Sequence, residues 1–168
     1  MRILVAEDEK GIRTQYQAIL QARGHKVVST ADGRECVETY RKELDLNKSS
    51  RPFDVVILDY RMPILDGLGA AKEILNLCPE QRIIFASAYV AETLRESARD
   101  LHQIVELLQK PFGLDYLVEI VEDTEVYMQL ESLNVKVKEL RDHNLTLSQL
   151  VGLLAGVRKL QSTVLSTH

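Results

Sequence analysis

Short apolar runs alternate along the first two thirds of the chain with segments whose apolar residues recur every three or four positions. The runs predict β-strands at residues 3–6, 27–28, 54–58, 82–86 and 104–108. The periodic segments predict helices around 12–20, 36–44, 68–75 and, with weaker periodicity, 92–99. Most runs are continuously apolar, which indicates strands covered on both faces and hence a parallel sheet. Repeated strand-helix units with right-handed crossovers predict a doubly wound α/β domain.

Five polar side chains stand directly after predicted strands. Glu7 and Asp8 follow the first strand, Asp59 the third, Ser87 the fourth and Lys110 the fifth. In an open parallel sheet the carboxyl ends of the strands share one edge, and ligands bind there. Carboxylates that gather at one edge need a cation among them, and a site of oxygen ligands suits Mg²⁺. The pattern therefore predicts a magnesium-dependent phosphoryl site.

At these positions the chain resembles the receiver domain of two-component response regulators. The likeness runs from about residue 1 to about residue 124 and rests on the pair Glu7-Asp8, the stretch DYRMPILDG at 59–67, Ser87-Ala88 and the run KPF at 110–112. Each motif is weak alone, but five matched positions in the right order are specific. The resemblance implies a flavodoxin-like, five-stranded parallel sheet with strand order 2-1-3-4-5.

The resemblance also implies roles for these side chains. Asp59 would accept a phosphoryl group from a sensor histidine kinase or a phosphotransfer protein, forming an aspartyl phosphate. The metal ligands would be Glu7, Asp8, Asp59 and the backbone carbonyl of Arg61, with Mg²⁺ as the cofactor. Lys110 would pair with the phosphoryl oxygens, and the Ser87 hydroxyl would report phosphorylation to the face formed by the last strand and its flanking helices. The expected function is a phosphorylation-dependent switch acting through protein contacts, not an enzyme.

The chain departs from the family pattern at Leu107, three residues before the lysine, where many members have Tyr or Phe. The aromatic side chain of the usual relay is therefore missing at this position. Arg61 and Tyr89, two residues after Asp59 and Ser87 respectively, are bulky and would shield an acyl phosphate from water. They predict a comparatively long-lived phosphoryl group.

Beyond a receiver at residues 1–125, residues 126–168 predict an all-α extension. No proline occurs from 114 to 164, and apolar residues fall on alternating steps of three and four, which indicates a coiled coil and a homodimer. A helical hairpin stays open as an alternative, because Asp142 and Asn144 could end one helix and Thr146 with Gln149 could cap the next. The coiled-coil seam comprises Leu130, Leu133, Val137, Leu140, Asn144, Leu147, Val151 and Leu154.

Composition and charge limit the classes of partner that the chain is expected to bind. The 168 residues carry a formal charge of −4, with a pI of about 5.6, which disfavours binding to nucleic acid or an anionic membrane. No apolar run approaches the roughly 18 residues of a membrane span, and acidic residues occur too early for a signal peptide. Cys36 and Cys78 fall in apolar-periodic segments and are expected to be reduced thiols. A cytoplasmic protein is expected.

Three other interpretations compete with the switch. A phosphatase of the haloacid dehalogenase type would need a second acid two residues after its nucleophile, where this chain has Arg61. A purely structural dimeriser with an inactive receiver would not need the complete set of acids, hydroxyl and lysine. The chain could also be the receiver fragment of a longer regulator whose output domain is absent.

Overall fold

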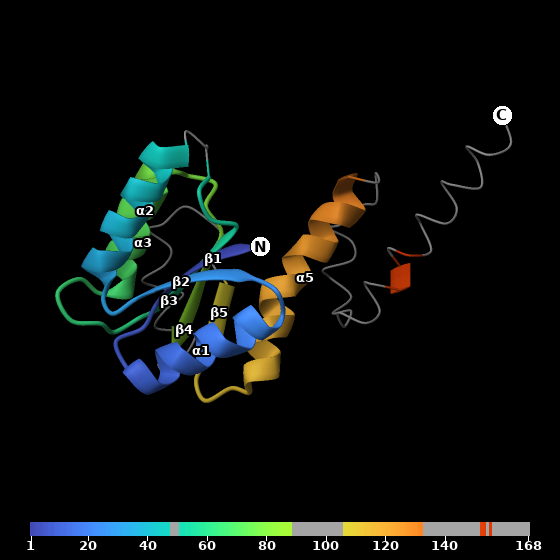
Figure 1. Ribbon diagram of the computed structural model, residues 1–168, viewed down its shortest axis with the longest axis horizontal. Helices are drawn as coiled ribbons and strands as arrows, with labels where there is room; N and C mark the ends of the chain where they lie inside the picture. The colour runs from blue at the N-terminus through green and yellow to red at the C-terminus, as the bar shows by residue number, and fades with distance from the viewer. Residues whose placement is uncertain (48–50, 89–105, 133–151, 154, 156–168) are drawn as a thin grey trace, which may run out of the picture. The chain divides into compact units, whose positions relative to one another are not determined.

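Five parallel strands form one sheet in the order β2-β1-β3-β4-β5, which confirms the predicted fold class and strand order (Figure 1). The structure is a computed structural model that describes residues 1–47, 51–88, 106–132, 152–153 and 155. Two units make up the chain, Met1–Asp115 and Tyr116–His168. The strands are β1 (Arg2–Ala6), β2 (Lys26–Thr30), β3 (Val55–Asp59), β4 (Ile83–Ser87) and β5 (Glu106–Gln109). Each lies within two residues of its predicted position.

Helices follow the strands as the periodicity predicts. They are α1 (Lys10–Ala22), α2 (Gly33–Asn47), α3 (Gly67–Leu77) and α5 (Leu114–Ser132). The predicted weaker helix at 92–99 lies outside the described residues. β2 and β3 lie on opposite sides of β1, so the connection from β1 to β2 and the connection from β2 to β3 run across the sheet in opposite directions. Right-handed crossovers therefore place α1 on one face and α2 with α3 on the other (Figure 1).

Alternate residues along each central strand form the core on the face that α2 and α3 cover. Leu4 of β1, Val56 of β3 and Phe85 of β4 belong to one buried cluster with Tyr40 of α2 and Ile74 of α3. Because side chains alternate between the two faces of a strand, the intervening buried residues point to the other face. Burial on both faces explains why these strands read as continuous apolar runs.

Gly24 ends α1. Its φ of 84° lies in the left-handed region, which glycine adopts without a steric penalty. The amide of Gly24 donates to the carbonyl of Gln21 at 2.9 Å, and the amide of His25 donates to that of Leu20 at 3.1 Å. This pair of bonds is the Schellman arrangement, which satisfies carbonyls left over at the end of a helix.

The segment that links β3 to α3 is closed tightly upon itself. The amide of Gly67 donates to the carbonyl of Tyr60 at 3.0 Å, and a β-carbon on Gly67 would overlap the carbonyl oxygen of Asp59. Asp66 caps α3 by accepting a hydrogen bond from the amide of Gly69 at 2.7 Å. A residue without a side chain is thus required where the loop returns to the end of β3.

In the second unit, α5 continues to Ser132 without a break at the predicted boundary of 125. That boundary is untested and stays a prediction. The coiled-coil seam beyond Ser132 falls entirely on residues outside the described part of the chain, so the coiled coil and the hairpin both stay predictions. Among the described residues, no helix combines the length and the apolar character that a membrane span requires.

We predict that Gly67→Ala lowers the free energy of unfolding by about 1 to 3 kcal/mol, because the new methyl group overlaps backbone that cannot rotate away. Urea denaturation measures this change. Gly11→Ala is the matched control, because a β-carbon there meets nothing within 4 Å and alanine favours the helix. Equal stability of the Gly67 variant and the parent chain would contradict the tight closure.

Candidate functional site

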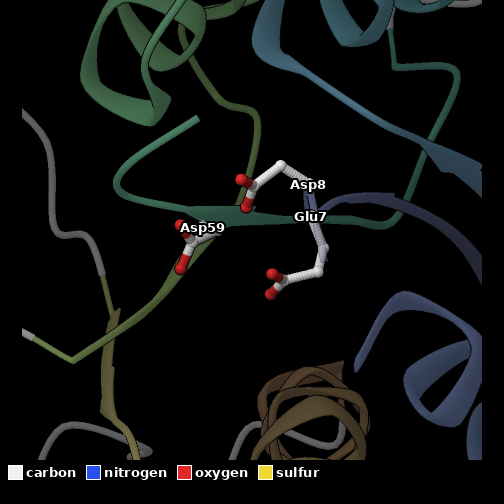
Figure 2. Close-up of side chains that lie close together, drawn as sticks. All are labelled: Glu7, Asp8 and Asp59. Atoms are coloured by element: carbon white, nitrogen blue, oxygen red, sulfur yellow. The ribbon is translucent and has the colours of Figure 1, made fainter. Parts of the chain in front are cut away.

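Three carboxylates meet where the order of the strands reverses. β1 lies between β2 and β3, and Glu7 and Asp8 directly follow β1 while Asp59 ends β3. One oxygen from each of the three carboxylates lies within 4.8 Å of the others (Figure 2). Glu7 is 1% exposed and Asp59 9%, whereas Asp8 is exposed. The predicted gathering of acids at the carboxyl edge of the sheet is therefore present.

Lys110, which follows β5, reaches back across the sheet to two of these acids. Its Nζ lies 2.7 Å from Oε2 of Glu7 and 2.8 Å from Oδ1 of Asp59. Only 16% of the lysine side chain is exposed. A single ammonium thus bridges two carboxylates that would otherwise repel each other.

Burial and the neighbouring charges shift the pKa in opposite directions at both Glu7 and Lys110. Burial raises the pKa of Glu7 above its usual range, and the hydrogen bond from Lys110 reduces this effect without cancelling it. Burial lowers the pKa of Lys110, but its hydrogen bonds to Asp59 and Glu7 outweigh this, and the pKa is raised overall. Lys110 is therefore a permanent cation near neutral pH. With all three acids ionised, three carboxylates and one ammonium leave a formal charge of −2 at the site.

This donor set fits Mg²⁺. The ion prefers carboxylate oxygens and is bound in proteins through few side chains, with its remaining positions filled by water or phosphate. Glu7, Asp8 and Asp59 supply oxygens within one ion's reach, and the excess negative charge is what a divalent cation would offset. Exposed Asp8 leaves that side of the cluster open to solvent.

Both oxygens of Asp59 have hydrogen-bond donors. Oδ1 accepts from Lys110, and Oδ2 accepts from the backbone amide of Arg61 at 3.0 Å. The contact that Arg61 makes with this carboxylate is therefore through its amide. The predicted role of its carbonyl as a metal ligand is untested and stays a prediction.

Ser87 ends β4 and is 2% exposed. Its carbonyl accepts a hydrogen bond from the amide of Lys110 at 2.7 Å, so the two residues are joined where β4 and β5 end. The Lys110-Pro111 peptide is cis. The role of the Ser87 hydroxyl stays a prediction. Leu107 lies in β5, and Tyr89 lies outside the described residues.

Arg13 contacts the acidic pair, which the sequence analysis did not predict. Its guanidinium donates to the backbone carbonyls of both Glu7 and Asp8 from the first turns of α1. It therefore ties the acidic pair to the helix and places a positive charge beside the cluster. A cation five residues after the acidic pair was the available signal in the sequence.

An aromatic stack supports the segment that follows Lys110. The rings of Tyr16 in α1 and Phe112 lie 5.8 Å apart between centroids, at an interplanar angle of 21°. These two rings line a cavity of about 240 Å³ with Lys110 and Pro111. The stack holds the loop after β5 against α1, and this was also not predicted.

Comparison with known sequences identifies a family. A family model described as "Response regulator receiver domain" matches residues 3–122. The transcriptional regulatory protein PdtaR of Mycobacterium tuberculosis is 36% identical over 124 residues, a match covering 72% of this chain and 55% of PdtaR. The chemotaxis protein CheY of Thermotoga maritima is 34% identical over 124 residues, covering 70% of this chain and 92% of CheY. The match thus spans about half the length of PdtaR.

Solved structures show the same fold. The receiver domain of sensor histidine kinase PA1611 from Pseudomonas aeruginosa, described with a magnesium ion coordinated in its active site cleft, superposes with a TM-score of 0.61 at 27% identity. That match covers 73% of this chain and 94% of the other. The response regulator TrrA of Thermotoga maritima, in complex with Mg²⁺ and BeF, gives a TM-score of 0.60 at 31% identity, covering 73% and 96%.

We predict that Lys110→Met lowers the free energy of unfolding by about 3 kcal/mol without added metal, because two largely buried carboxylates lose their shared cation. Urea denaturation at neutral pH measures the loss, and adding Glu7→Gln should restore part of it. Arg41→Met is the control: its ion pair with Glu73 is solvent-exposed, so its loss should cost less than about 1 kcal/mol. The bridge would be refuted if both methionine variants were equally stable.

Proposed function

The chain belongs to the response regulator receiver domain family, and from this we propose that Asp59 accepts a phosphoryl group from a phosphohistidine on a partner protein. The phosphorylated and unphosphorylated forms would then be the two states of a signalling switch. The observation that carries the proposal is the position of Asp59, at the carboxyl edge of the sheet between a lysine ammonium and two further carboxylates. The partner is a sensor histidine kinase or a phosphotransfer protein.

The chemistry follows from the contacts of Asp59. A carboxylate oxygen attacks phosphorus while the bond from phosphorus to the histidine nitrogen breaks, and the nitrogen leaves with its electron pair. Lys110, already hydrogen-bonded to Oδ1, is in place to pair with the added phosphoryl oxygens. The Arg61 amide holds Oδ2 and so restricts rotation of the carboxylate. The chain's own residues thus orient the nucleophile.

Glu7, Asp8 and Asp59 are the residues that would hold Mg²⁺ in this proposal. When bound, the ion neutralises charge on phosphoryl oxygens. Arg13 would keep the Glu7-Asp8 segment in position for this, because its guanidinium joins the two backbone carbonyls. The backbone carbonyl of Arg61 is proposed as a further ligand.

The output is proposed to be a protein contact and not a turnover reaction. Ser87, joined to Lys110 through its backbone, would carry the change at the phosphoryl group to β5 and its neighbouring helices. The helix that continues past residue 122 would extend into a coiled coil and form a homodimer. Two buried, free cysteines fit the reducing cytoplasm, which is the proposed location.

We predict that acetyl phosphate with Mg²⁺ adds the mass of one phosphoryl group to the chain, because Asp59 is the nucleophile. Intact mass spectrometry measures the addition, which Asp59→Asn should abolish. Asp66→Asn is the matched control: it changes an exposed acid of the same loop, and asparagine also caps a helix. An unmodified parent chain would favour the inactive structural dimeriser, and continuous release of phosphate from a phosphomonoester would favour the phosphatase.

We predict that the full chain has the mass of a dimer in light scattering, while a version ending at residue 126 has the mass of a monomer. The reason is that the whole heptad seam lies beyond that residue. If both versions contain the same number of chains per particle, the extension is not the dimerising element.

A further inference from the structure

Helix α1 contacts both the acids and the lysine segment of the site. Near its start, the guanidinium of Arg13 donates to the two backbone carbonyls of the pair Glu7-Asp8. Three residues later, the ring of Tyr16 stacks on Phe112, with the centroids 5.8 Å apart and the planes inclined at 21°. The first contact fixes the acidic pair relative to the helix, and the second fixes the segment that carries Lys110. α1 therefore sets the spacing between the acids and the lysine.

Tyr16 lies inside the fold, beside the charged site. It is 4% exposed, and it lines a cavity of about 240 Å³ together with Lys110 and Phe112. Burial raises the pKa of its hydroxyl, while the Lys110 ammonium lowers this pKa and the carboxylates of Glu7 and Asp59 raise it further. The phenol is therefore within electrostatic range of the groups that would meet a phosphoryl group.

The backbone around Lys110 is restrained on both sides. Its amide donates to the carbonyl of Ser87 at 2.7 Å, which joins it to the end of β4. On the other side, one residue separates Lys110 from Phe112, whose ring lies against Tyr16. The stack thus restrains the lysine segment on the side that leads away from β5.

This restraint matters because the ammonium has to change partners. Nζ of Lys110 lies 2.7 Å from Glu7 and 2.8 Å from Asp59, and in the proposed reaction it pairs with phosphoryl oxygens instead. A lysine carries its charge on a flexible four-carbon stem, so the place where its backbone is held decides what it can reach. A misplacement of about 1 Å in such a group can cost about a hundredfold in rate.

We propose that Tyr16 is a positioning residue for phosphoryl transfer, whose ring holds the backbone of Lys110 so that the ammonium reaches the phosphoryl group on Asp59. The inference rests on the proposed function and adds a residue of α1 to it. Tyr16 acts through Phe112 and Lys110, and the contact is made by its ring and not by its hydroxyl.

Three full-length variants separate positioning from stability. Tyr16→Leu removes the stack and keeps an apolar side chain, whereas Tyr16→Phe keeps the ring. Tyr40→Leu is the matched control, because Tyr40 is also buried and stacks on Phe53 at 5.9 Å, in the cluster that α2 and α3 cover. Both leucine variants should lower the thermal midpoint by about 5 to 10 °C, since each loses a buried aromatic pair.

Phosphorylation by acetyl phosphate with Mg²⁺, followed by intact mass spectrometry, measures the positioning. Tyr16→Leu should be phosphorylated about tenfold more slowly than the parent chain, because its ammonium is misplaced. Tyr16→Phe should stay within about twofold of the parent rate, and so should Tyr40→Leu despite its lower stability.

Calorimetric binding of Mg²⁺ alone gives a second readout, which does not depend on the reaction. If Tyr16→Leu displaces the lysine, the acids lose a competing cation and should bind Mg²⁺ about threefold more tightly than in the parent chain. A ring that only supported the fold around the acids would have the opposite effect, because its loss would loosen the ligands and weaken binding.

Equal phosphorylation rates for Tyr16→Leu and a phosphorylated parent chain would overturn the inference. So would a similar slowing in Tyr40→Leu, a tenfold slowing in Tyr16→Phe, or binding of Mg²⁺ by Tyr16→Leu that is no tighter than that of the parent. A parent chain that acetyl phosphate leaves unmodified would instead refute the proposed function, and the inference would fall with it.

Discussion

The site depends on one lysine that bridges two largely buried acids. Lys110 Nζ holds Glu7 and Asp59 at hydrogen-bonding distance, although burial disfavours the charged form of Glu7. Without that ammonium, the carboxylates at the ends of β1 and β3 would repel each other in a region of low dielectric. With the ammonium present, the cluster keeps enough negative charge to attract a divalent cation. The ammonium itself is a cation that can pair with a phosphoryl group. This balance gives the site the geometry that the proposed phosphorylation switch requires.

The fold supplies the positions that this bridge requires. The parallel order places the ends of β1, β3, β4 and β5 at one edge, so residues about fifty and one hundred positions apart in the sequence come into contact. Contacts around the site then fix its details: Arg13 holds the backbone of the acidic pair, and the Tyr16-Phe112 stack holds the segment after Lys110.

Much of this arrangement was predictable from the sequence because it is local or repeated. Apolar runs and helical periodicity located the strands and helices. The strand order came only from family resemblance, since pairing between distant strands leaves no periodic signal. The Arg13 contacts depend on how α1 is set against the loop before it, and the φ of 68° at Ile64 contradicts the extended preference of isoleucine. Both arise from tertiary packing.

A crystal structure of the full chain grown with Mg²⁺ and beryllofluoride, which mimics an acyl phosphate, tests the central claim most directly. The account predicts beryllofluoride on the Asp59 carboxylate, Lys110 Nζ within hydrogen-bonding distance of its fluorines, and the metal held by Glu7, Asp8 and Asp59. An unmodified Asp59 still paired with Lys110, or a metal bound away from these three acids, would contradict it.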